Sequence, residues 1–234
     1  MPVDPLYIIL TTYNRQENAL STVHRVLNNL QFDGPLNWIL CDDGSDMVGG
    51  QTYIHPIVEA IERAGQEVVR IYNGDRRGVG HMMNSGIRSV RELGGDVFLM
   101  LEDDWDLQEW GYDFTPDVNL LRAYTDTGMI RYGYISPGQS FHLFTRDSRL
   151  WFRMGIHQYR FSGHPSLRHI RFHGHYGMYK EGLPPGETEL SMCAQVNYKP
   201  EGPMILVPCY PQQAYGLFGH TGTASLKNVR PENA

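Results

Sequence analysis

Residues 98–105 read FLMLEDDW, and this stretch decides how the fold is interpreted. The apolar run at its start is typical of a short buried strand, and three carboxylates, Glu102, Asp103 and Asp104, follow it directly. In open α/β sheets, ligands bind at the carboxyl ends of the strands. Adjacent carboxylates repel one another, so such a cluster usually holds a hard cation such as Mg²⁺ or Mn²⁺. The stretch therefore predicts either a metal–phosphate site or a solvated acidic turn.

The composition fits a globular protein with a sizeable core. The chain has 234 residues, of which 41% are hydrophobic and 20% charged. Its formal net charge of −6 argues against broad non-specific binding to nucleic acid. The three cysteines lack CxxC spacing, which indicates neither a zinc site nor a disulfide framework. No leader-like start and no apolar run of roughly 18 residues is present, so we expect a cytoplasmic protein.

Strand-like and helix-like segments alternate in the first half of the chain. Apolar, β-branched runs predict strands at 7–11, 37–41, 67–72 and 97–101. Apolar residues three and four apart predict helices at 19–30, 54–64 and 79–93. Asn14 and Glu17 have the spacing of a capping box before the first helix. This alternation predicts an α/β fold with parallel βαβ units and helices on both faces of the sheet.

The second half loses this rhythm. The pattern predicts a helix at 115–126 and a strand at 129–135. From about residue 136 the sequence is rich in Gly, Pro, His and aromatic residues, so we expect loops, short strands and one or two helices there. No repeat or linker interrupts the chain. We therefore expect a single domain over 1–234, made of halves 1–106 and 107–234.

Three polar clusters follow predicted strands: TTYNR at 11–15, CDDGSD at 41–46 and LEDDW at 101–105. The carboxyl ends of parallel strands meet at one edge of a sheet, so these clusters should converge. Of Asp42 and Asp43, we expect one to accept hydrogen bonds from a base or ribose and the other to form the Asp-Gly turn. Tyr13 is expected either to stack on a nucleobase or to be half-buried at the strand end.

A fourth cluster, RRGVGHMMNSG at 76–86, suits phosphate. Gly78 and Gly80 precede a predicted helix, whose N-terminus favours an anion, and glycines allow close approach of the backbone. Arg76 and Arg77 add positive charge. The cluster is not the dinucleotide fingerprint, because Met83 stands where that motif has its third glycine, and the chain also lacks a P-loop pattern.

Taken together, these motifs resemble those of the family 2 glycosyltransferases, which have the GT-A fold. IILTTYNR matches their first strand and its ending, and WILCDDGSD matches the second about thirty residues later. The family pattern Asn-x-Gly-x-x-x-Ala-Arg-Asn-x-Gly is kept at Gly78, Asn84 and Gly86. Glu102-Asp103-Asp104 stands at the Asp-x-Asp motif. The departures are Arg76, Met82, Met83 and the Glu at position 102. The match covers roughly residues 6–106.

The resemblance implies a Rossmann-like, mostly parallel central sheet and an irregular C-terminal region that binds the acceptor. It implies a metal-dependent, inverting enzyme that moves a sugar from a nucleotide-sugar, most often a UDP-sugar, to an acceptor hydroxyl. The residues implied in nucleotide binding are Thr11, Tyr13, Asn14, Arg15, Asp42, Asp43, Arg76, Arg77, Gly78, Asn84 and Asp103.

Within that set, Thr11, Tyr13 and Asp43 would hold the base. Arg76 or Arg77 would contact the base or the diphosphate, and Asp103 would lie near the ribose. Loss of the usual arginine at Met83 suggests that one of these two arginines does phosphate work in its place.

Metal binding is implied for Mn²⁺ or Mg²⁺. Glu102 and Asp104 occupy the motif positions, with Asp104 the most direct ligand. His220, in the sequence GLFGHTG, would be an additional metal or diphosphate contact or else a structural histidine.

The family places a catalytic base before a helix, and PPGETELSM at 184–192 looks like that element. The alignment makes Glu187 the candidate base and Glu189 the second choice. The alternative is that acidic residues here complement the dipole of the helix start.

The segment 146–175 contains six arginines, five histidines and one acid, interleaved with aromatic residues. This composition suits a phosphorylated or single-stranded nucleic-acid acceptor, and aromatic rings also stack on saccharides. The alternative is a solvated basic face. Trp105, Trp110 and Trp151 are candidate sugar platforms. His173 and His175 have a spacing that can ligate metal, but no Cys or paired-His motif supports such a site.

Two rival functions remain open. A sugar-phosphate nucleotidylyltransferase shares an α/β sheet and a metal site but has a basic, Gly-rich loop after its first strand, which TTYNRQEN lacks. A non-catalytic protein that binds nucleotide-sugar or carbohydrate is the other rival. The three acids at 102–104 argue against it.

Overall fold

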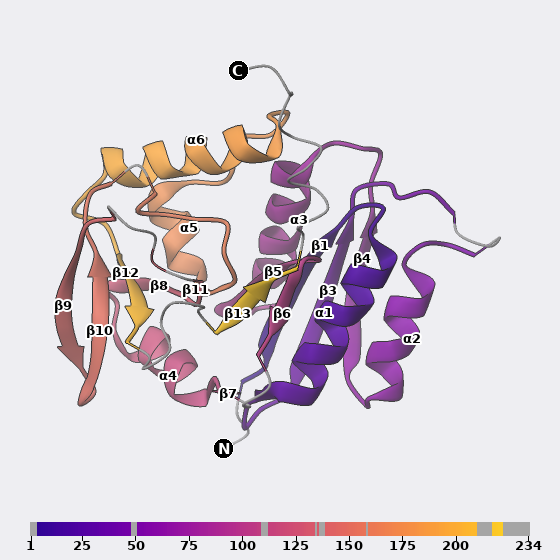
Figure 1. Cartoon of the computed structure of the whole chain (residues 1–234), viewed down its shortest axis with the longest axis horizontal. Helices are drawn as coiled ribbons and strands as arrows, with labels where there is room; N and C mark the ends of the chain where they lie inside the picture. Colours follow the sequence, from indigo (N-terminus) through magenta and orange to yellow (C-terminus); the bar gives the residue numbers. More distant parts are fainter. Residues whose placement is uncertain are drawn as a thin grey trace.

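A nine-stranded sheet runs through both halves of the chain, with helices on both of its faces (Figure 1). The computed structural model describes residues 4–47, 51–108, 112–133, 135, 139–157, 159–209 and 217–221. No helix in this part is long and apolar enough to cross a membrane.

The first half has the predicted βαβ alternation. Four parallel strands lie in the order β4-β3-β1-β5. These strands are β1 (Leu6–Thr12), β3 (Leu36–Asp42), β4 (Glu67–Asn73) and β5 (Val97–Glu102). The helices between them are α1 (Gln16–Asn29), α2 (His55–Arg63) and α3 (Val79–Glu92). Every strand and helix predicted before residue 102 is therefore confirmed, with boundaries shifted by three residues at most.

The second half extends the same sheet in the order β11-β8-β12-β10-β9 beyond β5. The strands are β8 (Thr127–Arg131), β9 (Phe141–Arg146), β10 (Arg149–Met154), β11 (Ser166–His169) and β12 (Met204–Pro208). β11 is antiparallel to both β5 and β8, so the purely parallel arrangement ends at β5.

The remaining elements complete the two flanking layers and two small ribbons. The helices are α4 (Thr115–Ala123), α5 (Ile170–Tyr176) and α6 (Pro185–Tyr198). β13 (Phe218–His220) pairs with β6 (Trp105–Leu107), and β2 (Leu30–Gln31) pairs with β7 (Tyr112–Asp113). The predicted helix at 115–126 ends early because Tyr124 is already extended.

Alternating side chains of β1 divide the core in two. Leu6, Ile8 and Leu10 point to one face, where α1, α2 and α4 pack. Tyr7 and Ile9 point to the other, which α3, α5 and α6 cover. α3 comes close to β1 because a Cβ at Gly86 would lie 2.4 Å from Ile9 Cγ2. This contact packs the middle of α3 against the middle of β1.

The predicted capping box before α1 does not form. Arg15, not Asn14, is the N-cap residue, and no side chain caps the helix. Asn14 has φ of +51°. Its Nδ2 donates to Asp46 Oδ2 at 3.1 Å, and its Oδ1 accepts the Asp46 N–H at 2.8 Å. Asn14 therefore ties the loop after β1 to the loop after β3, which a local motif could not reveal.

Candidate functional site

The acidic motif at the end of β5 is fastened to the end of β1. Asp103 is completely buried. Its Oδ2 accepts hydrogen bonds from Thr12 Oγ1 at 2.8 Å and from the Tyr13 N–H at 3.2 Å. Its Oδ1 lies 2.8 Å from Arg15 Nη2. Burial raises the pKa of Asp103 to about 6, against the opposing effect of Arg15. These contacts bring two of the predicted polar clusters together.

Asp104 lies between two basic side chains. Its Oδ2 is 2.6 Å from Arg15 Nη1 and 3.4 Å from His220 Nε2. The β6–β13 ribbon places His220 opposite Trp105, and the Thr221 N–H donates to the Asp104 carbonyl at 2.8 Å. The expected proximity of His220 to the acidic motif is thus present. Asp104 Oδ1 is buried and has no hydrogen-bond partner among the described residues.

Glu102 points to a different place from the two aspartates. It lines a pocket of about 330 Å³ together with Glu189, Gly163 and His220. Desolvation, then the charges of Asp104, Asp103 and Glu189, raises the pKa of Glu102 to about 8. Arg15 is the one cation that offsets this effect. The cluster therefore carries more negative charge than its arginine neutralises.

This excess charge and the Asp104 oxygen without a hydrogen-bond partner suit a divalent cation. The protein would supply only some of the ligands of that cation. Within the described residues, no three His, Cys, Asp or Glu side chains are grouped closely enough to hold a metal ion. Asp104 and His220 supply at most two ligands. Mg²⁺ commonly binds through one or two carboxylates and completes its shell with water and substrate phosphates. The residues present fit that mode.

The two aspartates after β3 have separate tasks, as the sequence suggests. Asp42 is buried and accepts the Ser45 N–H at 3.1 Å and the Ser45 hydroxyl, which forms the turn. Asp43 is partly exposed, and both of its carboxylate oxygens lie 3.0 Å from the Gly78 nitrogen. Asp42 is thus the turn residue, and Asp43 is the one with surface available to a ligand.

The other residues predicted to contact a base differ in their exposure. Tyr13 is 38% exposed, and the Arg76 guanidinium lies 5.6 Å from the centre of its ring. Arg76 also pairs with Asp46 at 2.9 Å. Thr11, in contrast, is buried, and its hydroxyl donates to the Leu101 carbonyl at 3.3 Å. Of the set predicted to contact a base, Tyr13, Asp43, Arg76 and Arg77 are therefore accessible, and Thr11 is not.

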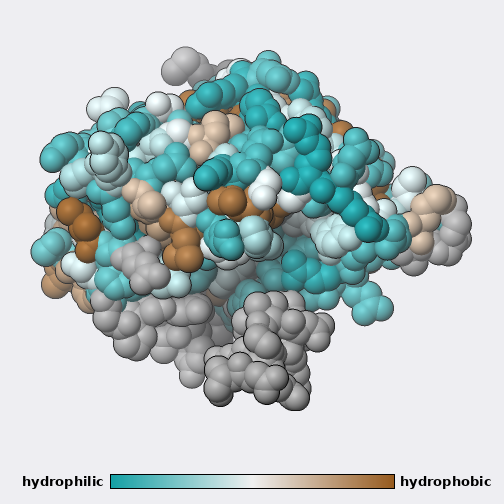
Figure 2. All heavy atoms as spheres, turned by 90° about the horizontal axis from the view of Figure 1, so that it is seen from above, coloured by the Kyte–Doolittle hydropathy of each residue, from teal (hydrophilic) through white to brown (hydrophobic). Residues whose placement is uncertain are grey.

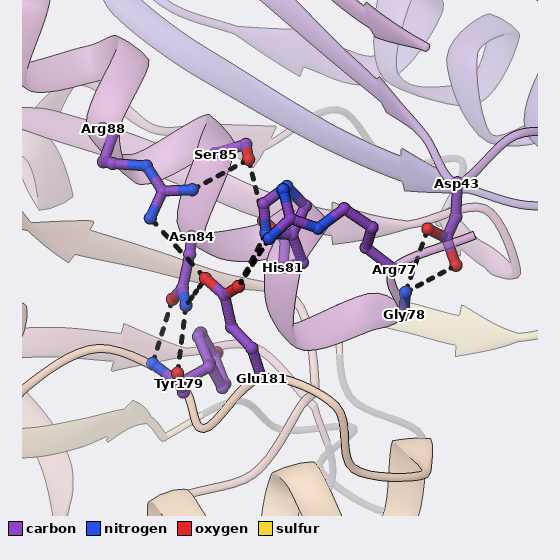
Figure 3. A network of polar contacts seen from close by, with 9 residues as sticks. All are labelled: Asp43, Arg77, Gly78, His81, Asn84, Ser85, Arg88, Tyr179 and Glu181. Atoms are coloured by element: carbon purple, nitrogen blue, oxygen red, sulfur yellow. Dashed lines mark hydrogen bonds and ion pairs between the residues drawn. The ribbon is translucent and has the colours of Figure 1, made fainter. Parts of the chain in front are cut away.

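The start of α3 is held by a polar network centred on Glu181 (Figure 3). Glu181 accepts from Asn84 Nδ2 at 2.9 Å, contacts His81 Nδ1 at 2.7 Å and lies 3.8 Å from Arg77. The hydrogen bonds from Asn84 and then His81 lower the pKa of Glu181 to about 2. Glu181 is thus a firmly ionised anchor for this end of the helix. Glu181 could not be predicted from the sequence, since neither spacing nor a neighbouring motif singles it out.

Asn84 and Gly80 serve this anchor. Asn84 is 2% exposed, and it pairs with both the Tyr179 carbonyl and the Tyr179 N–H at 3.0 Å (Figure 3). A Cβ at Gly80 would lie 2.8 Å from the Lys180 carbonyl oxygen. In the structure Asn84, predicted to contact the nucleotide, holds the 177–184 loop, which leads directly into α6. The Gly78 N–H, predicted for phosphate, donates to Asp43.

The 330 Å³ pocket lies where α3 and α6 meet the end of β5. Its aromatic walls are Phe161 and Tyr179. Glu189 enters it from the first turns of α6, and its Oε1 accepts the Gly163 N–H at 2.7 Å. Glu187 is exposed and does not line the pocket. The structure therefore places the second-choice glutamate, not the first, opposite Glu102.

This face of the molecule is seen from above in Figure 2, where hydrophilic residues predominate and apolar ones form small patches between them. In Figure 1, α6 lies across the top, above α3.

The basic segment 146–175 is not a continuous basic surface. Five of its six arginines bond to other groups of the protein: Arg146 with Asp126, Arg149 with buried Asp117, Arg160 with the Val196 carbonyl, Arg168 with Tyr179, and Arg171 with the Tyr124 carbonyl. The segment therefore offers less unpaired positive charge than its composition suggests, and a phosphorylated or nucleic-acid acceptor there stays a prediction. Charge composition alone could not show these pairings because the partners lie far away in the chain.

The candidate sugar platforms are also revised. Trp151 is completely buried, and Trp105 is 6% exposed between the rings of His164 and His220. A stacking platform needs an exposed ring face, so neither can serve. Trp110 lies outside the described residues. His173 is buried and bonded to the Gly177 carbonyl, so it makes no metal pair with His175, whose ring lies edge-on to Tyr176.

Neither a family model nor a curated protein sequence matches the chain. Solved structures do match it. Staphylococcus aureus TarS in complex with UDP-GlcNAc superposes with a TM-score of 0.63 at 12% identity, over 94% of this chain and 61% of that one. A longer TarS structure gives 0.62 at 12% identity, over 93% and 37%. The apo form of a UDP-glucose pyrophosphorylase gives 0.55 at 7% identity, over 95% of each chain.

These likenesses show the fold. TarS is a GT-A glycosyltransferase, and the chain has the same GT-A type of α/β architecture, as the sequence predicted. The chain spans 37% to 63% of the length of the TarS chains that it matches.

Proposed function

We propose that the protein is a glycosyltransferase that moves a sugar from a nucleoside diphosphate sugar to an acceptor hydroxyl. The observation that carries the proposal is the meeting of three features at one edge of the sheet. These are the accessible Asp43, the Asp103–Asp104 pair, and a pocket in which Glu102 and Glu189 face each other. They supply, in turn, a nucleotide contact, a site of charge for a diphosphate-bound cation, and a base beside an acceptor cavity.

The donor would bind across the ends of β3, β1 and β5. Tyr13 would stack on the base, Asp43 would accept its N–H groups, and Arg76 lies beside both. UDP-sugars are the first donors to test, because the sequence motifs resemble those of enzymes that use them, and the TarS structures hold UDP and UDP-GlcNAc.

Glu189 would be the general base. Its carboxylate would take the proton of the acceptor hydroxyl while that oxygen attacks the anomeric carbon and the bond to the nucleoside diphosphate breaks. This single displacement inverts the anomeric centre, as the resemblance implies. The Gly163 N–H holds the carboxylate in place, and the pocket shields it from bulk water. Asp104 and His220 would hold Mn²⁺ or Mg²⁺, which when bound stabilises the charge of the leaving diphosphate.

The pocket favours a neutral, hydroxyl-bearing acceptor such as a saccharide. Its walls are aromatic, and its polar groups include two glutamates, which repel phosphate. A phosphorylated or nucleic-acid acceptor would have to place its charges outside this cavity.

The test is release of UDP from a panel of UDP-sugars with saccharide acceptors and Mn²⁺, comparing wild type with Glu189→Gln and Glu187→Gln. General bases contribute about 10²- to 10⁴-fold, so Glu189→Gln should lose at least about 10²-fold in turnover while keeping its affinity for UDP. Glu187→Gln, an exposed neighbour in the same turn, should behave as wild type. Wild-type turnover by Glu189→Gln would remove Glu189 as the base.

A nucleotidylyltransferase is the second candidate, because the UDP-glucose pyrophosphorylase matches 95% of this chain and of its own. That reaction would release pyrophosphate from UTP and a sugar 1-phosphate. Pyrophosphate release without UDP release from UDP-sugars would favour it. Binding of UDP-sugars with neither product would favour the non-catalytic alternative.

A further inference from the structure

Arg15 makes a bidentate bridge between the two aspartates of the acidic motif. Its Nη1 lies 2.6 Å from Asp104 Oδ2, and its Nη2 lies 2.8 Å from Asp103 Oδ1. The planar guanidinium fork matches this geometry, and charge-assisted bonds of this length are strong. The Arg15 N–H in turn donates to the Tyr53 hydroxyl at 2.9 Å, and that hydroxyl is 2.5 Å from Thr12 Oγ1. The backbone of Arg15 is thus held by Tyr53, and its guanidinium is held by the two aspartates.

This bridge occupies the oxygens that a metal ion would need. Asp103 Oδ2 already accepts hydrogen bonds from Thr12 and Tyr13, and its Oδ1 forms an ion pair with Arg15 but no hydrogen bond. On Asp104, Oδ2 faces Arg15 and His220, so only Oδ1 has no hydrogen-bond partner among the described residues. A divalent cation placed there would also be close to the positive guanidinium.

Arg15 has space to move away. Its side chain is 36% exposed, whereas those of its two carboxylate partners are 1% and 7% exposed. It lines a surface cavity of about 380 Å³ together with Asn14, Asp46 and Tyr53. The acids are therefore the fixed part of the ion pair, and the arginine is the part that can swing out.

We propose that Arg15 is a built-in counter-cation that competes with the divalent ion for Asp104. Without nucleotide, the guanidinium neutralises the motif and metal binding is weak. A nucleoside diphosphate supplies further oxygen ligands to the metal and negative charge that draws Arg15 away, so metal and nucleotide bind cooperatively. This inference rests on the proposed function for the nucleotide, but its first half concerns metal binding alone.

The experiment measures Mn²⁺ affinity by the electron paramagnetic resonance signal of free Mn²⁺, with and without UDP. The proteins are wild type, Arg15→Gln, Arg15→Lys and Arg63→Gln. Arg63 is an exposed arginine paired with Glu59 far from the motif, so Arg63→Gln controls for net charge. Arg15→Lys keeps the charge but loses the two-pronged fork. Thermal unfolding shows whether each variant is folded.

Without UDP, Arg15→Gln should bind Mn²⁺ about tenfold more tightly than wild type, the equivalent of one charge-assisted hydrogen bond removed. Arg15→Lys should fall between the two, and Arg63→Gln should match wild type. UDP should raise the Mn²⁺ affinity of wild type by about tenfold or more, and that of Arg15→Gln by less.

Equal or weaker Mn²⁺ binding by both Arg15 variants would overturn the proposal. The proposal would also be overturned if UDP binds to the wild-type protein but leaves its Mn²⁺ affinity unchanged. If UDP does not bind at all, the proposed function fails. The comparison without UDP still decides whether Arg15 competes with the metal. If Arg15→Gln does not fold, Arg15→Lys alone makes the same comparison.

Discussion

Three carboxylates follow one another at the end of β5, and each has a different environment. Asp103 is buried, with hydrogen bonds to Oδ2 and an ion pair at Oδ1. Asp104 lies between Arg15 and His220, and Glu102 faces Glu189 across a pocket. Successive residues that leave a strand point in different directions, so adjacent acids need not share a task. Asp103 maintains the structure, Asp104 is the candidate metal ligand, and Glu102 belongs to the acceptor side.

The environment of Glu102 predicts a pH-dependent stability. Its pKa in the folded protein is about 8, above the ordinary value of 4.5, so the folded state holds this proton more tightly than the unfolded state. Stability should therefore fall as pH rises from about 4.5 to about 8. Glu102→Gln mimics the protonated acid. At pH 8.5 its free energy of unfolding should exceed that of wild type by on the order of 2–4 kcal/mol. At pH 4 the two free energies of unfolding should be nearly equal.

Urea denaturation of both proteins at the two pH values, in the presence of EDTA, measures this difference. A gap that is the same at pH 4 and pH 8.5 would show that Glu102 does not titrate as stated.

Asp104 gives a second prediction at this scale. Asp104→Ala removes the oxygen without a partner and one arm of the Arg15 bridge, so the affinity for UDP should no longer depend on Mn²⁺. Calorimetric titration with UDP, with and without Mn²⁺, makes the comparison. A variant that retains a metal-dependent affinity for UDP would show that Asp104 is not the ligand.

At the scale of elements, the junction of α3 with the 177–184 loop sets the position of α6. Asn84 hydrogen-bonds to both backbone groups of Tyr179. The Glu181 carboxylate hydrogen-bonds to the side chains of Asn84 and His81. Gly80 allows the loop to pass close to the helix. Glu189 lies on α6 beyond this loop. The clamp therefore couples the nucleotide side of the site to the candidate base.

Breaking the clamp should cost stability. Asn84→Ala leaves the Tyr179 N–H and carbonyl without partners in a buried place, which should lower the free energy of unfolding by about 2–3 kcal/mol. Ser85→Ala is a matched control, since the Ser85 hydroxyl donates to the His81 carbonyl and accepts from Arg88, and both partners lie on its own helix. Equal losses in the two variants, measured by urea denaturation, would argue against a clamp.

Local sequence patterns predicted the elements of the first half but not how distant elements meet. The spacing of apolar residues predicted β1, α1, β3, α2, β4, α3 and β5, because each of these elements is determined by residues close together in the chain. The antiparallel insertion of β11 beside β5 depends on a pairing across more than sixty residues, which no period encodes. The sequence ranked Glu187 above Glu189 by resemblance alone. It could not show which one faces inward, because two residues along a helix point about 200° apart and the packing of α6 decides this.

At the scale of the whole molecule, the sheet brings distant segments to one edge. β1, β3 and β5 run in parallel and end together, which collects Tyr13, Asp43 and the acidic motif. The second half adds His220 through β13 and Glu189 through α6. The fold thus brings Glu102, at the end of β5, into one pocket with residues of α6 and β13 from the second half.

The most direct test of this account is the thermal shift of the wild-type protein with UDP, GDP, CDP and TDP, each with and without Mn²⁺ or Mg²⁺. A ligand that binds the folded state stabilises it in proportion to the logarithm of its concentration over its Kd. We expect UDP with metal to raise the Tm clearly, and UDP alone to raise it less. If none of the four diphosphates raises the Tm with either metal, the edge formed by β1, β3 and β5 is not a nucleotide site, and the proposed transferase function is contradicted.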